Sequence, residues 1–263
     1  MESNEADFFE KGPWSGVTLD IVVPFYNEES NIHKTHQSNK RLENLFHVRN
    51  YVYVDNGSKD KTRSLLEDLA RSDAKVKVVV VETNTGYGDG MKAGLLAASA
   101  DYILTNHADM QFDSYTFFTQ NLPVIKAVSK PCSVFPYRTN RPLSDRAFSF
   151  FLRSILSGFQ FKRIYDFNGQ PKLFPRVLPN ELIRNFPKDF SFDFAVYSCF
   201  HSSSSLRLPV FQKDRLSGVS SWNINYFARF RQIRNWLLMG FRISFQGKYS
   251  ALREFQRNGT RSP

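Results

Sequence analysis

The first hundred residues alternate short aliphatic runs with segments whose apolar residues recur at helical spacing. The runs lie at 19–24, 51–54, 76–81 and 102–105. They are rich in β-branched residues without polar alternation, which is typical of strands covered on both faces. Helices are predicted between them at 28–45, at 62–69 and from the end of a loop at 84–90 to Ser99. This order predicts an α/β fold with a largely parallel sheet.

The pattern continues beyond residue 112 with longer helices and fewer strands. Helices are predicted at 114–128, 145–159 and 192–200, and strands at 133–137 and 206–211. The longest aliphatic run, 76–81, is interrupted by Lys77, whereas a membrane-spanning helix needs about 20 apolar residues. We therefore expect no integral membrane segment.

A loop with three glycines precedes the predicted helix that ends at Ser99. Gly86, Gly88 and Gly90 would allow backbone N–H groups to approach a phosphate at the helix start. The loop is not a dinucleotide fingerprint, because Met91 stands where the third glycine belongs, and no G-K-[ST] follows as in a P-loop. An equally ordinary interpretation is that these glycines only form a turn.

Polar residues that follow the strand at 102–105 have the spacing of a cation site. His107, Asp109 and Gln111 lie at i, i+2 and i+4, so in an extended segment they point to one side. The alternative is that Asp109 caps the helix beginning near Ser114 and that His107 is a buried histidine with satisfied hydrogen bonds.

Charge is distributed unevenly along the 263 residues. The net charge is +10, and residues 207–263 hold 11 Lys or Arg against two acidic residues, so nine of the ten charges lie there. The partner of such a segment is expected to be anionic. Aromatic residues from Trp222 to Phe245 stand between its arginines, as in a segment that lies at a membrane surface. Packing on the main domain and nucleic-acid binding are the alternatives, the latter without any recognised motif.

Cysteine usage and the N-terminus bear on the compartment. Cys132 and Cys199 are too few to staple a domain of this size, and residues 1–7 are acidic where an export signal is basic and then apolar. We expect a reducing, cytoplasmic environment.

Four motifs together resemble family 2 glycosyltransferases of the GT-A fold, in order and spacing. They are 21–29 (IVVPFYNEE), 54–60 (VDNGSKD), 84–88 (NTGYG) and 108–111 (ADMQ). Later segments, 166–174 (DFNGQPKLF) and 215–220 (RLSGVS), are similar to the polyprenol-phosphate sugar transferases of that family. The resemblance covers roughly residues 18–222. It implies a Rossmann-like GT-A catalytic domain with helices on both faces of the sheet, over 1–212, followed by a basic aromatic tail at 213–263.

The resemblance also implies which residues bind the nucleotide sugar. They are Pro24, Tyr26, Asn27, Glu28, Asp55, Asn56, Gly86, Gly88, Lys92, Ala108 and Asp109. The family usually has two aspartates where this chain has Asp55 and Asn56. An amide donates as well as accepts, so the base specificity is left open.

By the same resemblance His107, Asp109 and Gln111 form the metal site, and Asp109 is the first catalytic candidate. His107 replaces the family's first aspartate, which makes Mn²⁺ plausible over Mg²⁺ and predicts weaker metal binding when the histidine is protonated. The ion would neutralise the charge that develops on the departing nucleoside diphosphate.

The acceptor decides whether a general base is needed. A lipid phosphate has a second pKa of about 6, so it is already an anionic nucleophile at neutral pH. Arg138 and Arg146, with Asp166 and Arg215, are the residues implied for binding it, although both Arg138 and Arg146 are also interpretable as surface arginines. A hydroxyl acceptor would require a base, for which Asp193 or Asp166 is available.

These observations predict an inverting hexosyltransferase. It would move a sugar from a nucleoside diphosphate sugar to a polyprenyl (dolichyl-type) phosphate, with Mn²⁺ or Mg²⁺, peripherally on the cytoplasmic face of a membrane in cell-envelope glycan synthesis. The alternatives are transfer to a glycan hydroxyl in polysaccharide or lipopolysaccharide synthesis, and a non-catalytic module that binds nucleotide sugars. No nucleic-acid partner is expected.

Overall fold

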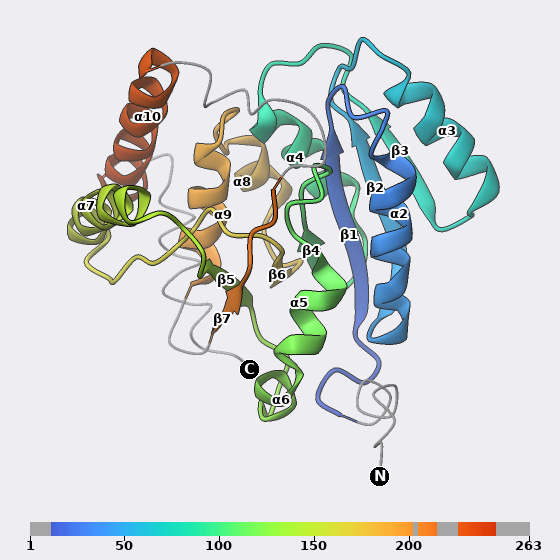
Figure 1. Cartoon of the computed structure of the whole chain (residues 1–263), viewed down its shortest axis with the longest axis horizontal. Helices are drawn as coiled ribbons and strands as arrows, with labels where there is room; N and C mark the ends of the chain where they lie inside the picture. Colours follow the sequence, from blue (N-terminus) through green and yellow to red (C-terminus); the bar gives the residue numbers. More distant parts are fainter. Residues whose placement is uncertain (1–11, 202–204, 215–225, 246–263) are drawn as a thin grey trace.

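A seven-stranded sheet forms the centre of the computed structural model, which describes residues 12–201, 205–214 and 226–245 (Figure 1). The strand order is β3-β2-β1-β4-β6-β5-β7. The strands are β1 (Thr18–Phe25), β2 (His47–Asp55), β3 (Val76–Val80), β4 (Tyr102–Thr105), β5 (Val134–Arg138), β6 (Lys172–Pro175) and β7 (Leu206–Val210). The first four are parallel to one another, and β5 and β7 are parallel, whereas β6 runs antiparallel between β4 and β5. The predicted mostly parallel α/β sheet is confirmed.

Helices cover both faces of this sheet. They are α2 (Ile32–Lys40), α3 (Thr62–Ser72), α4 (Tyr87–Ala97), α5 (Ser114–Gln120), α6 (Leu122–Lys126), α7 (Leu143–Gln160), α8 (Asn180–Arg184), α9 (Ser191–Phe200) and α10 (Tyr226–Phe245), with a short 3-10 helix at Arg41–Asn44. Because side chains alternate along a strand, Val22 of β1 joins one buried cluster while Ile21 and Val23 join the other.

Among the predicted helices that differ from the observed ones, two have a clear local feature at the difference. The helix expected at 114–128 is broken at Asn121, because Pro123 begins a second helix and has no backbone N–H. The side chain of Asn121 donates to the carbonyl of Phe117 at 2.8 Å and so satisfies the end of α5. The loop expected at 84–90 ends earlier, since α4 already begins at Tyr87.

The described part of the basic tail is a helix of the main core. In α10, Trp236, Met239 and Ile243 are buried in the same cluster as Leu152 and Leu156 of α7. Residues 215–225 and 246–263, which include Trp222, lie outside the described residues. Among the helices that are described, none combines the length and apolar character needed to cross a membrane.

Candidate active site

The residues predicted to bind the nucleotide and the metal lie mainly in and after the ends of β1, β2 and β4. β1 lies between β2 and β4, so the chain leaves β1 toward β2 and later returns to its other side at β4. Ligands bind at such switch points in open α/β sheets, beyond the carboxyl ends of the strands. The loops after these three strands therefore define the candidate site.

The loop after β1 is locked to the loop after β2. Asn27 has a left-handed backbone (φ 54°), its N–H donates to Ser58 Oγ at 3.1 Å, and its Oδ1 accepts from the Lys59 N–H at 2.8 Å. The N–H of Glu28 donates to Thr62 Oγ1 at 2.9 Å. Pro24 lies in β1, and Tyr26 remains largely exposed at the rim.

The end of β2 is tied to the start of α4. Asp55 is buried and accepts from the Ser58 N–H at 3.0 Å. The Asn56 amide nitrogen donates to the carbonyl of Gly86 at 3.1 Å, while its buried Oδ1 has no hydrogen-bond partner among the described residues. That oxygen is an acceptor within the predicted base-binding pair.

The glycines at the start of α4 are explained by close packing. The N–H of Gly88 donates to the carbonyl of Lys188 at 2.6 Å, and a Cβ on Gly86 or Gly88 would collide with the backbone of that segment. In this structure the Gly88 N–H is therefore already hydrogen-bonded to another part of the protein. Gly86 has a left-handed φ of 140°, which favours glycine.

Lys92 is held at the same end of the helix. Its Nζ lies 2.5 Å from Asp89 Oδ1 and donates to the carbonyl of Phe186 at 3.3 Å. Burial alone would raise the pKa of the Asp89 carboxyl, but its hydrogen bonds and the charge of Lys92 lower it. At the candidate site, Lys92 thus forms an ion pair with Asp89.

The segment after β4 is a turn, so the expected extended arrangement of His107, Asp109 and Gln111 is wrong. Met110 has a left-handed φ of 58°, and Asp109 Oδ1 accepts from the Gln111 N–H at 3.1 Å. The Gln111 amide nitrogen donates to the carbonyl of Lys213 at 3.3 Å. The carbonyl of Ala108 accepts from Thr35 Oγ1 at 3.1 Å, which ties this turn to α2.

Asp109 does not cap the following helix. The residue that caps α5 is Asp113, whose side chain accepts from the Thr116 N–H at 2.9 Å. Asp109 is nevertheless 3 % exposed, so a buried carboxylate without a capping role lies in the turn. This observation favours the ligand-binding interpretation of Asp109.

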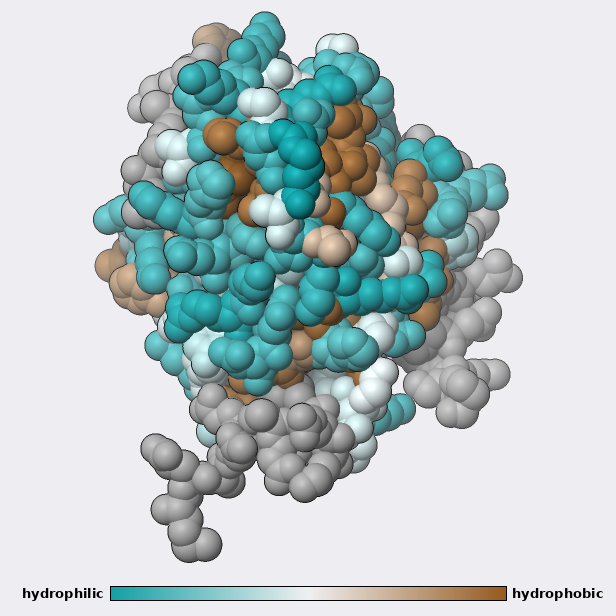
Figure 2. All heavy atoms as spheres, turned by 90° about the vertical axis from the view of Figure 1, so that its right-hand side faces the viewer, coloured by the Kyte–Doolittle hydropathy of each residue, from teal (hydrophilic) through white to brown (hydrophobic). Residues whose placement is uncertain are grey.

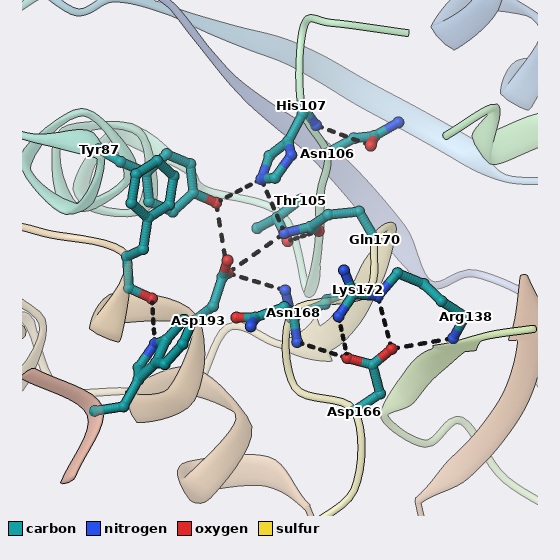
Figure 3. Close-up of polar contacts among 12 residues, drawn as sticks. Tyr87, Thr105, Asn106, His107, Arg138, Asp166, Asn168, Gln170, Lys172 and Asp193 are labelled. Carbon is teal, nitrogen blue, oxygen red and sulfur yellow. Dashed lines mark hydrogen bonds and ion pairs between the residues drawn. The ribbon is translucent and has the colours of Figure 1, made fainter. Parts of the chain in front are cut away.

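A buried polar network joins His107 to Asp193 (Figure 3). His107 Nε2 lies 3.2 Å from the hydroxyl of Tyr87, which donates to Asp193 Oδ1 at 3.4 Å. The same carboxylate oxygen lies 2.9 Å from Nζ of the buried Lys172. Burial lowers the pKa of Lys172 while Asp193 opposes that shift, and burial followed by the charge of Asp193 raises the pKa of Tyr87.

Gln170 lies at the centre of this network. In one orientation its amide nitrogen donates to Asp193 Oδ1 at 3.3 Å and lies 3.4 Å from His107 Nε2, but that nitrogen then also faces the Lys172 ammonium group. Oriented with the oxygen toward the lysine, it accepts from Lys172 Nζ at 2.8 Å and donates to the carbonyl of Thr105 at 3.1 Å. We favour that orientation because the opposite one points the amide nitrogen at an ammonium group.

The ion pair of Arg138 and Asp166 lies next to the pair of Lys172 and Asp193. Arg138 donates from Nε and Nη2 to the two carboxylate oxygens of Asp166, each at 2.8 Å, and its backbone N–H donates to Oδ2 at 3.1 Å. Burial alone would raise the pKa of Asp166, but the charge and hydrogen bonds of Arg138 lower it to about 2. Arg146 is exposed on α7, and Arg215 lies outside the described residues.

A cavity of about 350 Å³ adjoins Asp166. It is lined by Phe135, Pro136, Tyr137, Arg153, Tyr165, Asp166, Tyr197 and Arg207. Arg207 stacks on the ring of Tyr165, with its guanidinium carbon 3.6 Å from the ring centroid. Two arginines in one cavity make it a candidate anion site.

Sequence reasoning missed several of these residues. Gln170 and Lys172 stand inside the 166–174 motif, so a signal was present, and Tyr87 stands between two predicted glycines. Arg153 and Arg207 belong to α7 and β7, and no local pattern distinguishes them from surface arginines. Only the fold brings them to one cavity.

Comparison with known proteins decides the family. The sequence profile described as "Glycosyl transferase family 2" matches residues 20–177, more than half of the chain. The protein belongs to glycosyl transferase family 2. Its catalytic class is therefore that of a glycosyltransferase, as the motifs predicted.

Curated relatives of this transferase match about a third of its chain. An uncharacterised glycosyltransferase of Bacillus subtilis, YkcC, is 34% identical over 97 residues, which are 36% of this chain and 30% of the relative. The undecaprenyl-phosphate 4-deoxy-4-formamido-L-arabinose transferase of Proteus mirabilis is 32% identical over 98 residues, 35% of this chain and 29% of the relative. The match thus spans less than a third of the length of these relatives.

Solved structures support the GT-A fold of the transferase. Glucosyl-3-phosphoglycerate synthase of Mycobacterium tuberculosis, crystallised with Mn²⁺, UDP-glucose and phosphoglyceric acid, superposes with a TM-score of 0.61. The superposition covers 89% of this chain and 82% of that chain at 17% identity. At that identity the likeness concerns the fold alone.

Proposed function

We propose that this transferase moves a sugar from a nucleoside diphosphate sugar to a polyprenyl phosphate, with inversion at the anomeric carbon. The observation that carries the proposal is the state of the two carboxylates predicted as general bases. Asp193 is 3 % exposed and paired with Lys172, and Asp166 is paired with Arg138.

Carboxylates held in this way are poor proton acceptors. A base works best when its pKa lies near the operating pH, whereas that of Asp166 is about 2. Proton uptake by Asp193 would also leave the Lys172 ammonium buried without its counter-charge. An acceptor that is already ionised needs no base, and a phosphate monoester meets that condition at neutral pH.

The donor would lie across the loops after β1 and β2. Asp55 and Asn56 are assigned to the base, and the orphaned Asn56 Oδ1 supports this, since a buried acceptor without a partner suits a donor group of a ligand. Tyr26, Asn27 and Glu28 would lie beneath the nucleotide.

The donor set after β4 fits a divalent cation. Among the described residues no three His, Cys, Asp or Glu side chains gather in a metal site, so in this proposal Gln111 would join His107 and Asp109 as the third ligand. Imidazole, carboxylate and amide oxygen together suit Mn²⁺ or Mg²⁺. Because His107 Nε2 faces Tyr87, we assign Nδ1 to the metal. When bound, the ion would supply positive charge to the departing diphosphate.

The acceptor phosphate is assigned to the arginine cavity beside Asp166. Arg153 and Arg207 line it together with Asp166, which forms an ion pair with Arg138. Arginine binds phosphate through its planar fork of donors and so would position the nucleophile. The relatives named as undecaprenyl-phosphate transferases support such an acceptor, which also implies that the enzyme works at a membrane surface.

A comparison of two variants tests the acceptor. Transfer of a labelled sugar to polyprenyl phosphate is measured in Asp193→Asn and in Arg153→Ala with Arg207→Ala. We expect the arginine variant to raise KM for the acceptor at least tenfold and to leave the KM for the donor unchanged. Asp193→Asn should retain measurable turnover, because it acts through its neighbours.

The opposite result would favour another acceptor. Complete loss of kcat in Asp193→Asn, with unchanged donor binding and unchanged melting temperature, would identify Asp193 as a base and the acceptor as a glycan hydroxyl. Specific donor binding without transfer to either acceptor would indicate a non-catalytic module.

A further inference from the structure

Two neighbouring helices expose a large apolar surface. α7 and α10 lie side by side on the left of Figure 1, and Phe159 of α7 packs against Phe241 of α10 with ring centroids 6.3 Å apart. Phe151 of α7 is 68 % exposed, and Phe227 and Phe230 of α10 are 87 % and 71 % exposed. We call the exposed surface of these two helices the α7–α10 face.

The sequence of α10 is apolar on two opposite sides. Its buried residues, Gln232, Trp236, Met239 and Ile243, recur at helical spacing and face the core. A second series also recurs at helical spacing on the other side, and its exposed apolar members are Phe227, Phe230, Leu238, Phe241 and Phe245. A surface helix normally has a polar outer side, so a partner is expected to cover this one.

Side chains of both helices line one groove. A hollow of about 380 Å³ is lined by Phe159 of α7 and by Phe230, Ile233, Leu237 and Phe241 of α10, with Arg234 among them. Phe148, Phe151 and Ile155 extend the apolar surface along α7, at the spacing of one helix stripe. The exposed surface is therefore continuous across both helices.

The charges on this face have one sign. α10 contains four arginines and no acidic residue, whereas Arg153 of α7 lines the cavity beside Asp166 and is not counted on this face. Arg231, Arg234 and Arg242 are exposed on α10. By contrast, Figure 2 shows mainly hydrophilic residues on the opposite side of the molecule, which carries α2 and α3. A partner that covers the α7–α10 face should thus have an anionic surface and an apolar interior.

We propose that the α7–α10 face lies on an anionic lipid bilayer. The aromatic side chains would enter the boundary between headgroups and acyl chains, and the arginines would extend to the lipid phosphates. An α-helix of this length extends for about 30 Å, with arginines spread along it. A flat anionic surface contacts such a row of charges simultaneously, which favours lipid over a protein partner.

This inference deepens the proposed function, because it names the surface through which a lipid acceptor would be reached. Vesicle binding needs neither donor nor metal, so it is measured separately from transfer. Transfer to a short-chain, water-soluble polyprenyl phosphate is expected in protein whose α7–α10 face has been altered. If the unaltered protein did not transfer sugar to this soluble acceptor, the proposed acceptor would be rejected. The membrane inference would not be affected by that result.

The experiment is vesicle sedimentation of the full chain. Vesicles of phosphatidylcholine alone are compared with vesicles that also contain phosphatidylglycerol. One variant carries Phe151→Ser, Phe230→Ser and Phe241→Ser, and another carries Arg231→Ala, Arg234→Ala and Arg242→Ala. Matched controls replace exposed residues elsewhere: Val124→Ser with Val177→Ser, and Lys34→Ala with Lys77→Ala.

We expect strong binding only to the anionic vesicles. Each arginine removed should weaken partitioning about fivefold, which corresponds to about 1 kcal/mol. The phenylalanine variant should lose at least tenfold, and both controls should bind like the unaltered chain. Unchanged melting temperatures would show that the variants remain folded.

Three results would overturn the inference. They are absence of binding to anionic vesicles, equal binding by the variants and the unaltered chain, and concentration-dependent self-association that the phenylalanine variant abolishes. The last would assign the α7–α10 face to a second copy of the chain.

Discussion

Tyr87 connects His107 to Asp193 through a single hydroxyl group. Replacing it by phenylalanine keeps the buried ring and removes both hydrogen bonds. We expect Tyr87→Phe to lower the free energy of unfolding by about 1 kcal/mol and to weaken Mn²⁺ binding, since His107 loses the group that orients it. Titration calorimetry with Mn²⁺ measures the second effect.

A matched tyrosine separates orientation of the histidine from general stability. The hydroxyl of Tyr197 accepts from the N–H of Tyr165 at 3.1 Å, away from His107. Tyr197→Phe should cost similar stability and leave Mn²⁺ binding unchanged. Equal Mn²⁺ affinity in both variants would show that the Tyr87 hydroxyl does not position His107.

Asp166 should make folding stability depend on acidic pH. Because its pKa is lowered from 3.8 to about 2 in the folded protein, the stabilisation is fully present above the unfolded value and is lost as the pH falls toward 2. The shift corresponds to about 2 kcal/mol. Denaturant unfolding should therefore show the advantage of the natural protein over Asp166→Asn shrinking between pH 4 and pH 2.

The exposed Asp145 of α7 provides the control for that experiment. Asp145→Asn is measured over the same pH range, and its effect is subtracted as the background of removing one carboxylate. A difference for Asp166→Asn that does not change with pH after this subtraction would mean that Arg138 does not stabilise the ionised carboxylate.

The sequence motifs predicted which residues belong to the candidate site, but they did not predict which residues contact one another. Asp55, Asp109 and Asp193 were all named from local motifs, and the structure places Asp55 at the end of β2 and Asp109 in the turn after β4. The pairing of Asp193 with Lys172 joins α9 to β6, 21 positions apart, and no local pattern encodes it. An even longer separation hid the contact of Tyr87, which lies 106 positions from Asp193.

At the scale of elements, the start of α4 depends on contact between two backbones. Gly88→Ala would force its Cβ against the carbonyl of Pro187, and this overpacking should cost about 1–3 kcal/mol of unfolding free energy. Thermal unfolding followed by circular dichroism measures the loss.

Gly158 of α7 is the corresponding control. It is exposed within a helix, and nothing lies within 4 Å of the position where a Cβ would stand. Gly158→Ala should therefore stabilise the protein by about 0.5–1 kcal/mol, because alanine favours the helix. Destabilisation by Gly158→Ala, or none by Gly88→Ala, would contradict this account of the two glycines.

Strands with a continuous aliphatic run were predicted well, and a strand without one was not. The strand at 102–105 and the α/β order are confirmed, because buried parallel strands have continuous aliphatic runs. β6 was missed since it has four residues, begins with Lys172 and ends with Pro175. Its lysine is buried only because Asp193 pairs with it, which is a tertiary effect.

At the scale of the whole molecule, α10 is bound to the core through Trp236. This side chain is 7 % exposed and lies against Phe167, with ring centroids 5.6 Å apart. Trp236→Ala should lower the free energy of unfolding by about 3–5 kcal/mol in one cooperative transition. A helix that did not pack on the core would instead leave the main transition unchanged.

Phe230 lies on the exposed side of α10, and its replacement tests whether that side contributes to stability. It is largely exposed, so Phe230→Ala should change stability by no more than about 0.5 kcal/mol. A large loss there would mean that the α7–α10 face is already covered within the chain.

The central claim is sugar transfer to a lipid phosphate at the edge where β1, β2 and β4 end. The most direct measurement incubates the purified chain with labelled nucleoside diphosphate sugars, Mn²⁺ and polyprenyl phosphate, and follows label into the organic phase. The account predicts a lipid-linked product with one donor and its loss in Asp109→Asn. Transfer that persists in folded Asp109→Asn, or no lipid-linked product with any donor, would contradict it.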